Sequence, residues 1–280
     1  MGLKKGFIVM NKARDFLERH SILGAILLYV AATAIIQVFG SVFDILIERN
    51  LNSYPGSLVS ILLSFLTLWI FKRIFKPDYD GALHLNGILK GLLYIWPLEL
   101  FFITLIFAFN PDNDVITYLV TAVWAGVNEE VCIRGVALAF LTYHFREQKH
   151  VPLILWGTSL VFALTHIPNM FIGGSVSGTI LQTISALGLG AMFAASFMRT
   201  GTLWPAIIIH SLNDFLVFMA STGTTSETVG VNSSAFDPSS FLEVLPIYCV
   251  YIAVAFFCIR KTKREEIVNL WNKKWGNENE

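Results

Sequence analysis

The chain has 280 residues, of which 55% are hydrophobic and only 14% are charged, and its mean hydropathy is +0.62. An average soluble domain is about 25% charged, and here 20 basic residues balance 20 acidic ones. This composition excludes a soluble globular enzyme, a disordered chain and a nucleic-acid-binding protein, and it indicates one integral membrane domain.

Apolar segments bounded by charged residues, Gly, Pro or Asn are each long enough to cross a bilayer. Their number predicts an all-α fold, a polytopic membrane helix bundle with about eight transmembrane helices. We expect these spans near residues 22–45, 55–71, 88–109, 115–142, 151–167, 178–198, 202–220 and 241–259. Residues 1–21 and the basic tail 260–280 then lie outside the membrane domain 22–259.

The basic residues predict the orientation of the bundle. All of them except Arg49 and Arg134 lie in the terminal segments, in every second connection between the expected spans or, for Lys90, at the adjoining edge of the third span. Loops rich in Lys and Arg stay in the cytoplasm. We therefore expect a multi-pass protein of the cell membrane with an even number of spans and with both termini in the cytoplasm.

Ionisable residues cost about 2.5–3.5 kcal/mol each at the centre of a bilayer on insertion scales, and the spans 115–142, 151–167 and 202–220 carry a set of them in motifs with helical spacing. These residues, with one neighbouring amide, are Glu129, Glu130, Arg134, His166, His210, Asn213 and Asp214. Counted at the helical rise of about 1.5 Å per residue, they all lie within the membrane. We expect the three spans to bring them together in one cavity that forms a functional site.

Helical spacing gives these residues different expected partners. Glu130 and Arg134 are four residues apart, so they share a helix face and are expected to form an ion pair. Glu129 is turned about 100° away and needs another partner. His210 and Asp214 are also four residues apart, and Asn213 lies near the same face.

Two kinds of hydrolytic chemistry fit this set. A carboxylate beside an imidazole is a general base for water, and a second imidazole with an acid or amide one turn away stabilises an oxyanion. The alternative is a Zn²⁺ ion, held by Glu129, His166 and His210, that activates the water. The residues alone leave both open. They also leave open an ion-coupled transporter with a relay through the carboxylates and Arg134.

Three motifs occur in order on successive expected helices, and together they resemble the signature of the CPBP intramembrane proteases, also called the Abi or type II CAAX prenyl endopeptidase family. The motifs read Glu129-Glu130-x-x-x-Arg134, Phe162-x-x-x-His166 and His210-x-x-x-Asp214. The resemblance extends over about residues 125–220, including Gly188-Leu-Gly190 and the stretch 199–205. It implies a protease-like core at 115–220.

The resemblance implies hydrolysis of a peptide bond in a membrane-associated peptide or protein, in CAAX-type, bacteriocin or pheromone processing. It assigns water activation to Glu129 and His166 and oxyanion stabilisation to His210 and Asp214. Glu130 and Arg134 then support the site. Many relatives have Asn at the position of Asp214, so Asn213 is a second candidate donor.

Other properties implied by the resemblance are less specific. Relatives are described both as glutamate proteases and as metalloproteases, so the dependence on Zn²⁺ stays open. The short chain is more similar to bacterial members. The expected partners are the substrate and the lipid bilayer, with no nucleic acid. The alternative within the same fold is a non-catalytic membrane scaffold or a bacteriocin self-immunity protein.

Overall fold

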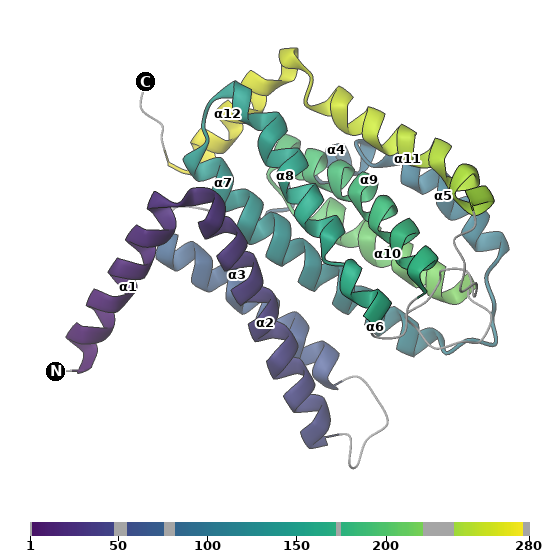
Figure 1. The fold of residues 1–280 in the computed structure, drawn as a ribbon, viewed down its shortest axis with the longest axis horizontal. Helices are drawn as coiled ribbons and strands as arrows, with labels where there is room; N and C mark the ends of the chain where they lie inside the picture. Colours follow the sequence, from purple (N-terminus) through teal and green to yellow (C-terminus); the bar gives the residue numbers. More distant parts are fainter. Residues whose placement is uncertain (1, 48–54, 76–81, 172–174, 221–237, 277–280) are drawn as a thin grey trace.

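The fold is all-α, as expected, in a computed structural model that describes residues 2–47, 55–75, 82–171, 175–220 and 238–276 (Figure 1). The helices before the site are α1 (Gly2–Arg19), α2 (Ser21–Ile47), α3 (Pro55–Phe75), α4 (Ile88–Leu93) and α5 (Trp96–Phe107). Those that follow are α6 (Val115–Glu130), the π-helix η1 (Val131–Leu138), α7 (Ala139–His144), the 3₁₀ turn η2 (Gln148–His150), α8 (Val151–Leu164), the 3₁₀ turn η3 (Ile167–Phe171), α9 (Val176–Thr200), α10 (Trp204–Ala220), α11 (Pro238–Cys258) and α12 (Lys261–Lys274).

Several of these helices are membrane spans by length and composition. Among the described residues four qualify, at Ser21–Phe43, Pro55–Phe75, Gln148–Phe171 and Val176–Thr200, and the bent pair formed by α11 and α12 would be a fifth. The chain is therefore a multi-pass membrane protein, whereas the number eight stays a prediction. The expected span 115–142 is not among them, and α10 is a shorter apolar helix.

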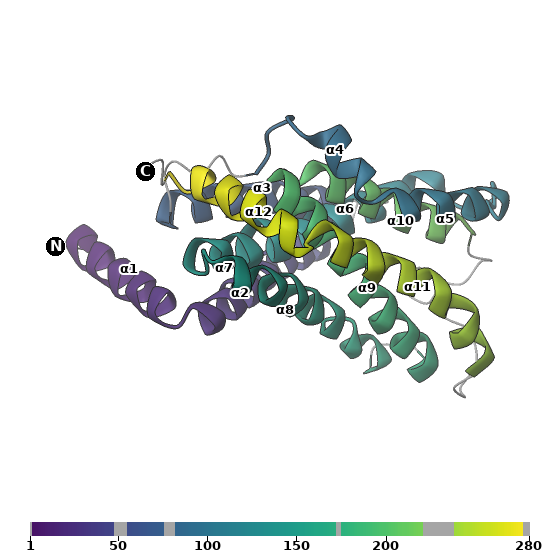
Figure 2. The same ribbon diagram turned by 90° about the horizontal axis from the view of Figure 1, so that it is seen from above.

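The expected spans differ from the helices in two places. The span predicted at 88–109 is not one helix, since α4 ends at Leu93 and α5 begins at Trp96. The N-terminal segment 1–21 is largely the helix α1, which projects from the body of the molecule in both ribbon views (Figures 1 and 2). In both views α1 and α12 lie at the same end of the bundle, whereas the side of the membrane on which the termini lie stays a prediction.

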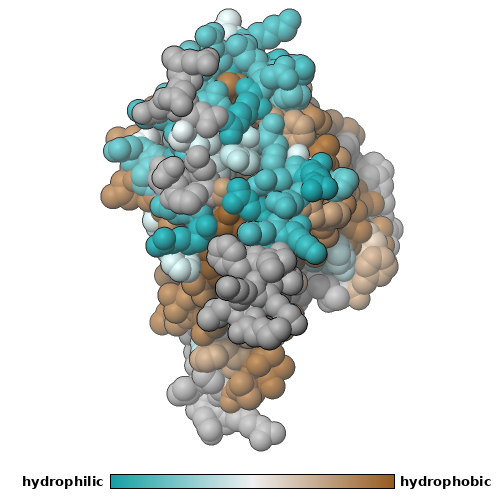
Figure 3. All heavy atoms as spheres, turned by 90° about the vertical axis from the view of Figure 1, so that its left-hand side faces the viewer, coloured by the Kyte–Doolittle hydropathy of each residue, from teal (hydrophilic) through white to brown (hydrophobic). Residues whose placement is uncertain are grey.

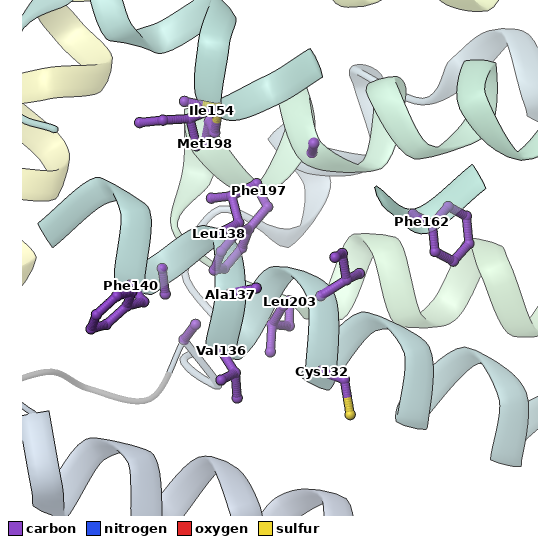
Figure 4. Close-up of a cluster of buried hydrophobic side chains, with 14 of the residues drawn as sticks. Cys132, Val136, Ala137, Leu138, Phe140, Ile154, Phe162, Phe197, Met198 and Leu203 are labelled. Carbon is purple, nitrogen blue, oxygen red and sulfur yellow. The ribbon is translucent and has the colours of Figure 1, made fainter. Parts of the chain in front are cut away.

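The centre of the bundle is the long element formed by α6, η1 and α7. Helix α10 packs against α6, α9 lies between α8 and α11, and α2 pairs with α3. All eight residues of η1 are buried. Figure 4 shows Val136 and Leu138 of η1 within a cluster that also contains Ile154 of α8 and Phe197 of α9. A π-helix in this position is notable because such segments occur frequently at functional sites.

Helix α12 closes one end of the bundle. Its Trp271 indole donates to the Met198 carbonyl at 3.1 Å, and its Trp275 indole donates to the Thr142 hydroxyl at 3.2 Å. These bonds fix α12 across the ends of α9 and α7. Figure 3 views this end of the molecule face on, where hydrophilic side chains gather and hydrophobic ones flank them.

A surface ion pair joins α12 to α9. Glu266 lies 2.9 Å from Arg199 and also accepts from Lys263. The hydrogen bond from Lys263, together with the positive charge of Arg199, lowers the pKa of Glu266 below its usual value.

Candidate functional site

The predicted ion pair between Glu130 and Arg134 forms at the junction of α6 and η1. Arg134 Nη1 lies 2.8 Å from Glu130 Oε1, and both side chains have no exposed surface. Arg134 Nη2 also donates to the Gly190 carbonyl of α9 at 3.0 Å. A Cβ atom at Gly190 would lie 3.2 Å from that same Nη2. Glycine at this position therefore allows the guanidinium to reach the backbone.

Two phenylalanines hold the charged groups from the sides. The guanidinium carbon of Arg134 lies 4.4 Å from the ring centre of Phe162 and 5.8 Å from that of Phe193. The Phe193 ring also stacks on the His210 ring at 5.4 Å with an interplanar angle of 23°. These cation–π and stacking contacts restrict the rotation of both polar side chains.

His210 of α10 connects the buried ion pair to the rest of the site. Its Nδ1 lies 2.8 Å from Glu130 Oε1. An ionised carboxylate only accepts hydrogen bonds, so we assign the proton to Nδ1. This fixes the ring with Nε2 facing Glu129 Oε2 at 3.5 Å and Asp214 Oδ2 at 3.6 Å. The expected convergence of α6 with α10 is therefore confirmed.

The site is open on one side only. The exposed fraction of the side chain rises from zero at Glu130 through 9% at His210 and 22% at Asp214 to 37% at Glu129. Because exposure increases in that order, water or a peptide would approach from the side of Glu129.

Asn213 and Asp214 do not lie equivalently around His210. Asn213 Nδ2 donates to Asp214 Oδ1 at 3.2 Å, whereas Asp214 Oδ2 faces His210. Within the described residues no hydrogen bond joins the Asn213 side chain to the imidazole. Of the two candidate donors, only Asp214 faces the ring.

His166 lies just beyond the end of α8, next to Phe162. Its Nδ1 is 3.1 Å from the Phe162 carbonyl, which can only accept, so Nδ1 carries the proton and Nε2 is the acceptor in the neutral ring. In the described part of the chain, no hydrogen bond or ion pair joins His166 to Glu129. The imidazole beside Glu129 is instead that of His210.

Two helices at the edge of the site contribute residues that sequence reasoning missed. Tyr29 of α2 is almost buried and lies close enough to interact electrostatically with Glu129. Asn128 ties α6 to α3: with its amide oriented to satisfy both atoms, it donates to the Ser60 carbonyl at 3.2 Å and accepts from the Trp124 indole at 2.6 Å. Phe193 and Tyr29 carry no spacing signal, because their contacts form between helices.

A metal site is not apparent from the arrangement of ligands. Across the residues that the structure describes, no group of three or more His, Cys, Asp or Glu side chains is placed to hold a metal ion. The zinc alternative with Glu129, His166 and His210 therefore stays a hypothesis that requires these side chains to move closer together.

Comparison with known proteins agrees with the resemblance seen in the motifs. Residues 111–216 match the family model described as type II CAAX prenyl endopeptidase Rce1-like, and this segment contains all three motifs and α6 with most of α10. No curated protein and no solved structure matches the chain. At the level of the family this supports a CAAX-type intramembrane endopeptidase. Residues 111–216, about two fifths of the chain, are therefore similar to the type II CAAX prenyl endopeptidase Rce1-like family.

Proposed function

We propose that this protein is an intramembrane endopeptidase that hydrolyses a peptide bond near the membrane-anchored end of a peptide or protein, with water activated by Glu129. One observation carries the proposal. A buried chain of contacts, from Arg134 through Glu130 to His210, fixes one imidazole so that its second nitrogen faces two further carboxyl groups. This is the arrangement in which a carboxylate orients a catalytic histidine.

The two glutamates have separate roles in the proposal. Glu130 is engaged by Arg134 and His210 and has no exposed surface, so it orients the histidine. Glu129 is the most exposed carboxylate of the site and is assigned as the general base. His166 keeps Nε2 as an acceptor and is assigned to the same water. Catalytic hydrogen bonds are often long before substrate binds, so the wide spacing of the free site is compatible with this role.

The oxyanion requires hydrogen-bond donors on the opposite side of the carbonyl. His210 donates from Nε2 when it is an imidazolium, and Asp214 donates from Oδ2 when it is protonated. The separations of 3.5 and 3.6 Å around Nε2 exceed a usual N–H···O hydrogen bond of about 2.7–3.2 Å. At these distances Nε2 is not held by either carboxylate, so its N–H can donate to an entering carbonyl oxygen instead.

The proposed reaction uses only these groups. Glu129 takes a proton from water while the oxygen of that water bonds to the peptide carbonyl carbon, and the carbonyl oxygen becomes the oxyanion held by His210 and Asp214. When the C–N bond breaks, the proton on Glu129 passes to the leaving nitrogen. The products are a new carboxylate and a new amine. No step passes through a metal ion.

The proposal is tested with purified protein in proteoliposomes and a panel of peptides with lipidated or unmodified C-terminal segments. We expect cleavage of at least one class by the wild type, and a loss of about 10²–10⁴-fold for Glu129→Gln, the usual contribution of general acid–base catalysis. Glu99→Gln is the matched control, since Glu99 is an exposed glutamate on α5. Near-normal cleavage by Glu129→Gln would reject the assignment.

The rival functions give different results in the same preparation. A scaffold or self-immunity protein would bind a partner with no cleavage by the wild type. A transporter would show solute or proton flux that depends on Glu129. Comparison of membrane peptides from cells with the wild type or Glu129→Gln then separates CAAX-type substrates from bacteriocin or pheromone precursors.

A further inference from the structure

A polar pocket and an apolar groove adjoin each other at the junction of α1, α2 and α7. The pocket, of about 540 Å³, is lined by Asp15, Glu18, Arg19, Tyr143, His144 and Arg146. The groove, of about 150 Å³, begins at Ile22 and Phe145 and runs between α2 and α8. Arg19 and Ile22 are three residues apart, and Phe145 lies between His144 and Arg146. The two hollows therefore adjoin each other along both chain segments, and we call the pair the depression.

The groove has the dimensions and chemistry of a site for a hydrocarbon chain. It follows α2 from Ile22 to Tyr29 and α8 from Leu153 to Val161, a length of about 10–12 Å at the rise of an α-helix. The hydroxyl of Thr158, which also lines it, donates to the Ile154 carbonyl at 2.8 Å. An apolar cavity of about 150 Å³ stays dry and accepts hydrocarbon.

Gly157 leaves free space in the groove, and no close contact between helices requires a glycine at this position. A Cβ atom at this position would have no heavy atom within 4 Å, in contrast to Gly190. Glycine within a helix costs roughly 0.5–1 kcal/mol relative to alanine, and here neither close packing nor a positive φ requires it. The free space at Gly157 is therefore a property of the groove itself.

The pocket carries charges of both signs. Arg19 and Arg146 provide two cations, and Asp15 and Glu18 provide two carboxylates, of which Glu18 also accepts from Arg14 Nε at 2.7 Å. Arginine matches a phosphate group, whereas carboxylates accept from an ammonium group. The balance of charges fits a zwitterionic headgroup better than an anionic one.

We infer that this depression binds one molecule of an amine-bearing zwitterionic glycerophospholipid, of the phosphatidylethanolamine class. The phosphate lies between Arg19 and Arg146, the ammonium group lies toward Asp15 and Glu18, and one acyl chain lies in the groove past Gly157. Because lipid tails offer an apolar environment on every side, the groove gives no hydrophobic gain of its own. The headgroup therefore decides which lipid is retained. This site is separate from the proposed catalytic groups and does not depend on the proposed function.

The test is native mass spectrometry of the full chain, purified in detergent and mixed with equal amounts of dioleoyl phosphatidylethanolamine, phosphatidylcholine and phosphatidylglycerol. The wild type should retain one phosphatidylethanolamine molecule in preference to the others. Asp15→Asn should lower the ratio of phosphatidylethanolamine to phosphatidylcholine by roughly three- to tenfold, which corresponds to one weakened charge-assisted hydrogen bond. Preference for phosphatidylglycerol, or no preference among the three, would overturn the inference.

Substitutions in the groove test the position of the acyl chain. Gly157→Leu fills the groove and should reduce the retention of all three lipids by roughly tenfold, or about 1.4 kcal/mol. Leu160→Phe is the matched control, because Leu160 is half exposed on the same helix and does not line the groove. Gly157→Ala is the second variant, since one methyl group fits the space; it should fold and give an intermediate loss. Retention like that of the wild type in both Gly157 variants would exclude the groove.

Discussion

Two adjacent glutamates occupy opposite environments in this protein. Glu130 has no exposed surface and is held by Arg134 and His210, each at 2.8 Å. Glu129 is 37% exposed, and its nearest cationic partner is His210 Nε2 at 3.5 Å. We call the first group of contacts the anchored side of the site and the groups around Glu129 and Asp214 the open side.

The two sides of the site have different roles: the anchored side holds His210 in place, and the open side carries the groups assigned to the reaction. On the anchored side Glu130, Arg134 and His210 each make at least one contact of 2.8 Å, so a change there should lower the stability of the fold. On the open side the spacing is wide and water has access, so a change there should be felt as lost turnover. A substitution on the anchored side that leaves stability unchanged, or one on the open side that leaves turnover unchanged, would contradict this comparison.

The largest expected effect is on the anchored side. Arg134→Gln leaves the carboxylate of Glu130 buried beside a neutral residue, so we expect the free energy of unfolding to fall by about 3–5 kcal/mol. The measurement is chemical denaturation in mixed micelles. Arg73→Gln is the control, because Arg73 also contacts an aromatic ring, that of Trp69, but on the surface. Equal losses in both variants would show that burial is not the cause.

The next effect is on the open side, at Asp214. Asp214→Ala should lower kcat by about 10²–10³-fold, the usual cost of removing one oxyanion donor. Asp214→Asn should keep much of the activity, because an amide donates at any pH. Both variants should unfold at the same denaturant concentration as the wild type. If the Asn variant is as inactive as the Ala variant, Asp214 acts as a proton relay or ligand instead.

A smaller effect is expected at Gly190, behind the anchored side. Gly190→Ala places a Cβ atom 3.0 Å from Phe162 and 3.2 Å from Arg134 Nη2. Overpacking of this kind costs about 1–3 kcal/mol, which denaturation would detect. Gly157→Ala is the matched control with free space around the new methyl group. If Gly190→Ala leaves the free energy of unfolding unchanged, the Arg134 side chain can shift to make room for the new methyl group.

The smallest effect should follow Asn213→Ala. The side chain donates to Asp214, and no hydrogen bond within the described residues joins it to His210, so its loss should cost about 0.5–1.5 kcal/mol in transition-state stabilisation, as for one ordinary hydrogen bond. Values of kcat/KM for this variant and for Asp214→Ala are the measurement. A larger loss of kcat/KM for Asn213→Ala than for Asp214→Ala would make Asn213 the oxyanion donor and Asp214 its support.

Much of this comparison could be predicted from regular spacing. Apolar runs give the positions of α2, α3, α8 and α9, since a span must be long and apolar. The four-residue separation gives the Glu130–Arg134 pair, because it lies within one helix. The third expected span is broken near Tyr94, and Pro97, the second residue of α5, is the signal for this break.

Contacts between helices could not be predicted in the same way. The bond between Glu130 and His210 joins residues 80 positions apart, and the position of a residue on its own helix does not say which neighbour it meets. For the same reason sequence reasoning missed the ring of Phe193, which stacks on that of His210. The roles of these groups in catalysis stay predictions.

The π-helix η1 has a consequence for the way this chain tolerates changes in length. The N–H of Ala139 donates to the carbonyl of Arg134, five residues earlier, so this segment holds more residues per turn than its neighbours. Gain or loss of one residue in an α-helix turns everything on one side by about 100° relative to the other. Within 131–138, however, the loss of one residue can convert the π-turn to an α-turn, so the segments on either side keep their faces. A deletion within α6 or α7 has no such extra residue to absorb it and would turn the side chains on one side of it away from their partners. Insertions and deletions should therefore accumulate in the connections and be tolerated in η1 better than in α6 or α7.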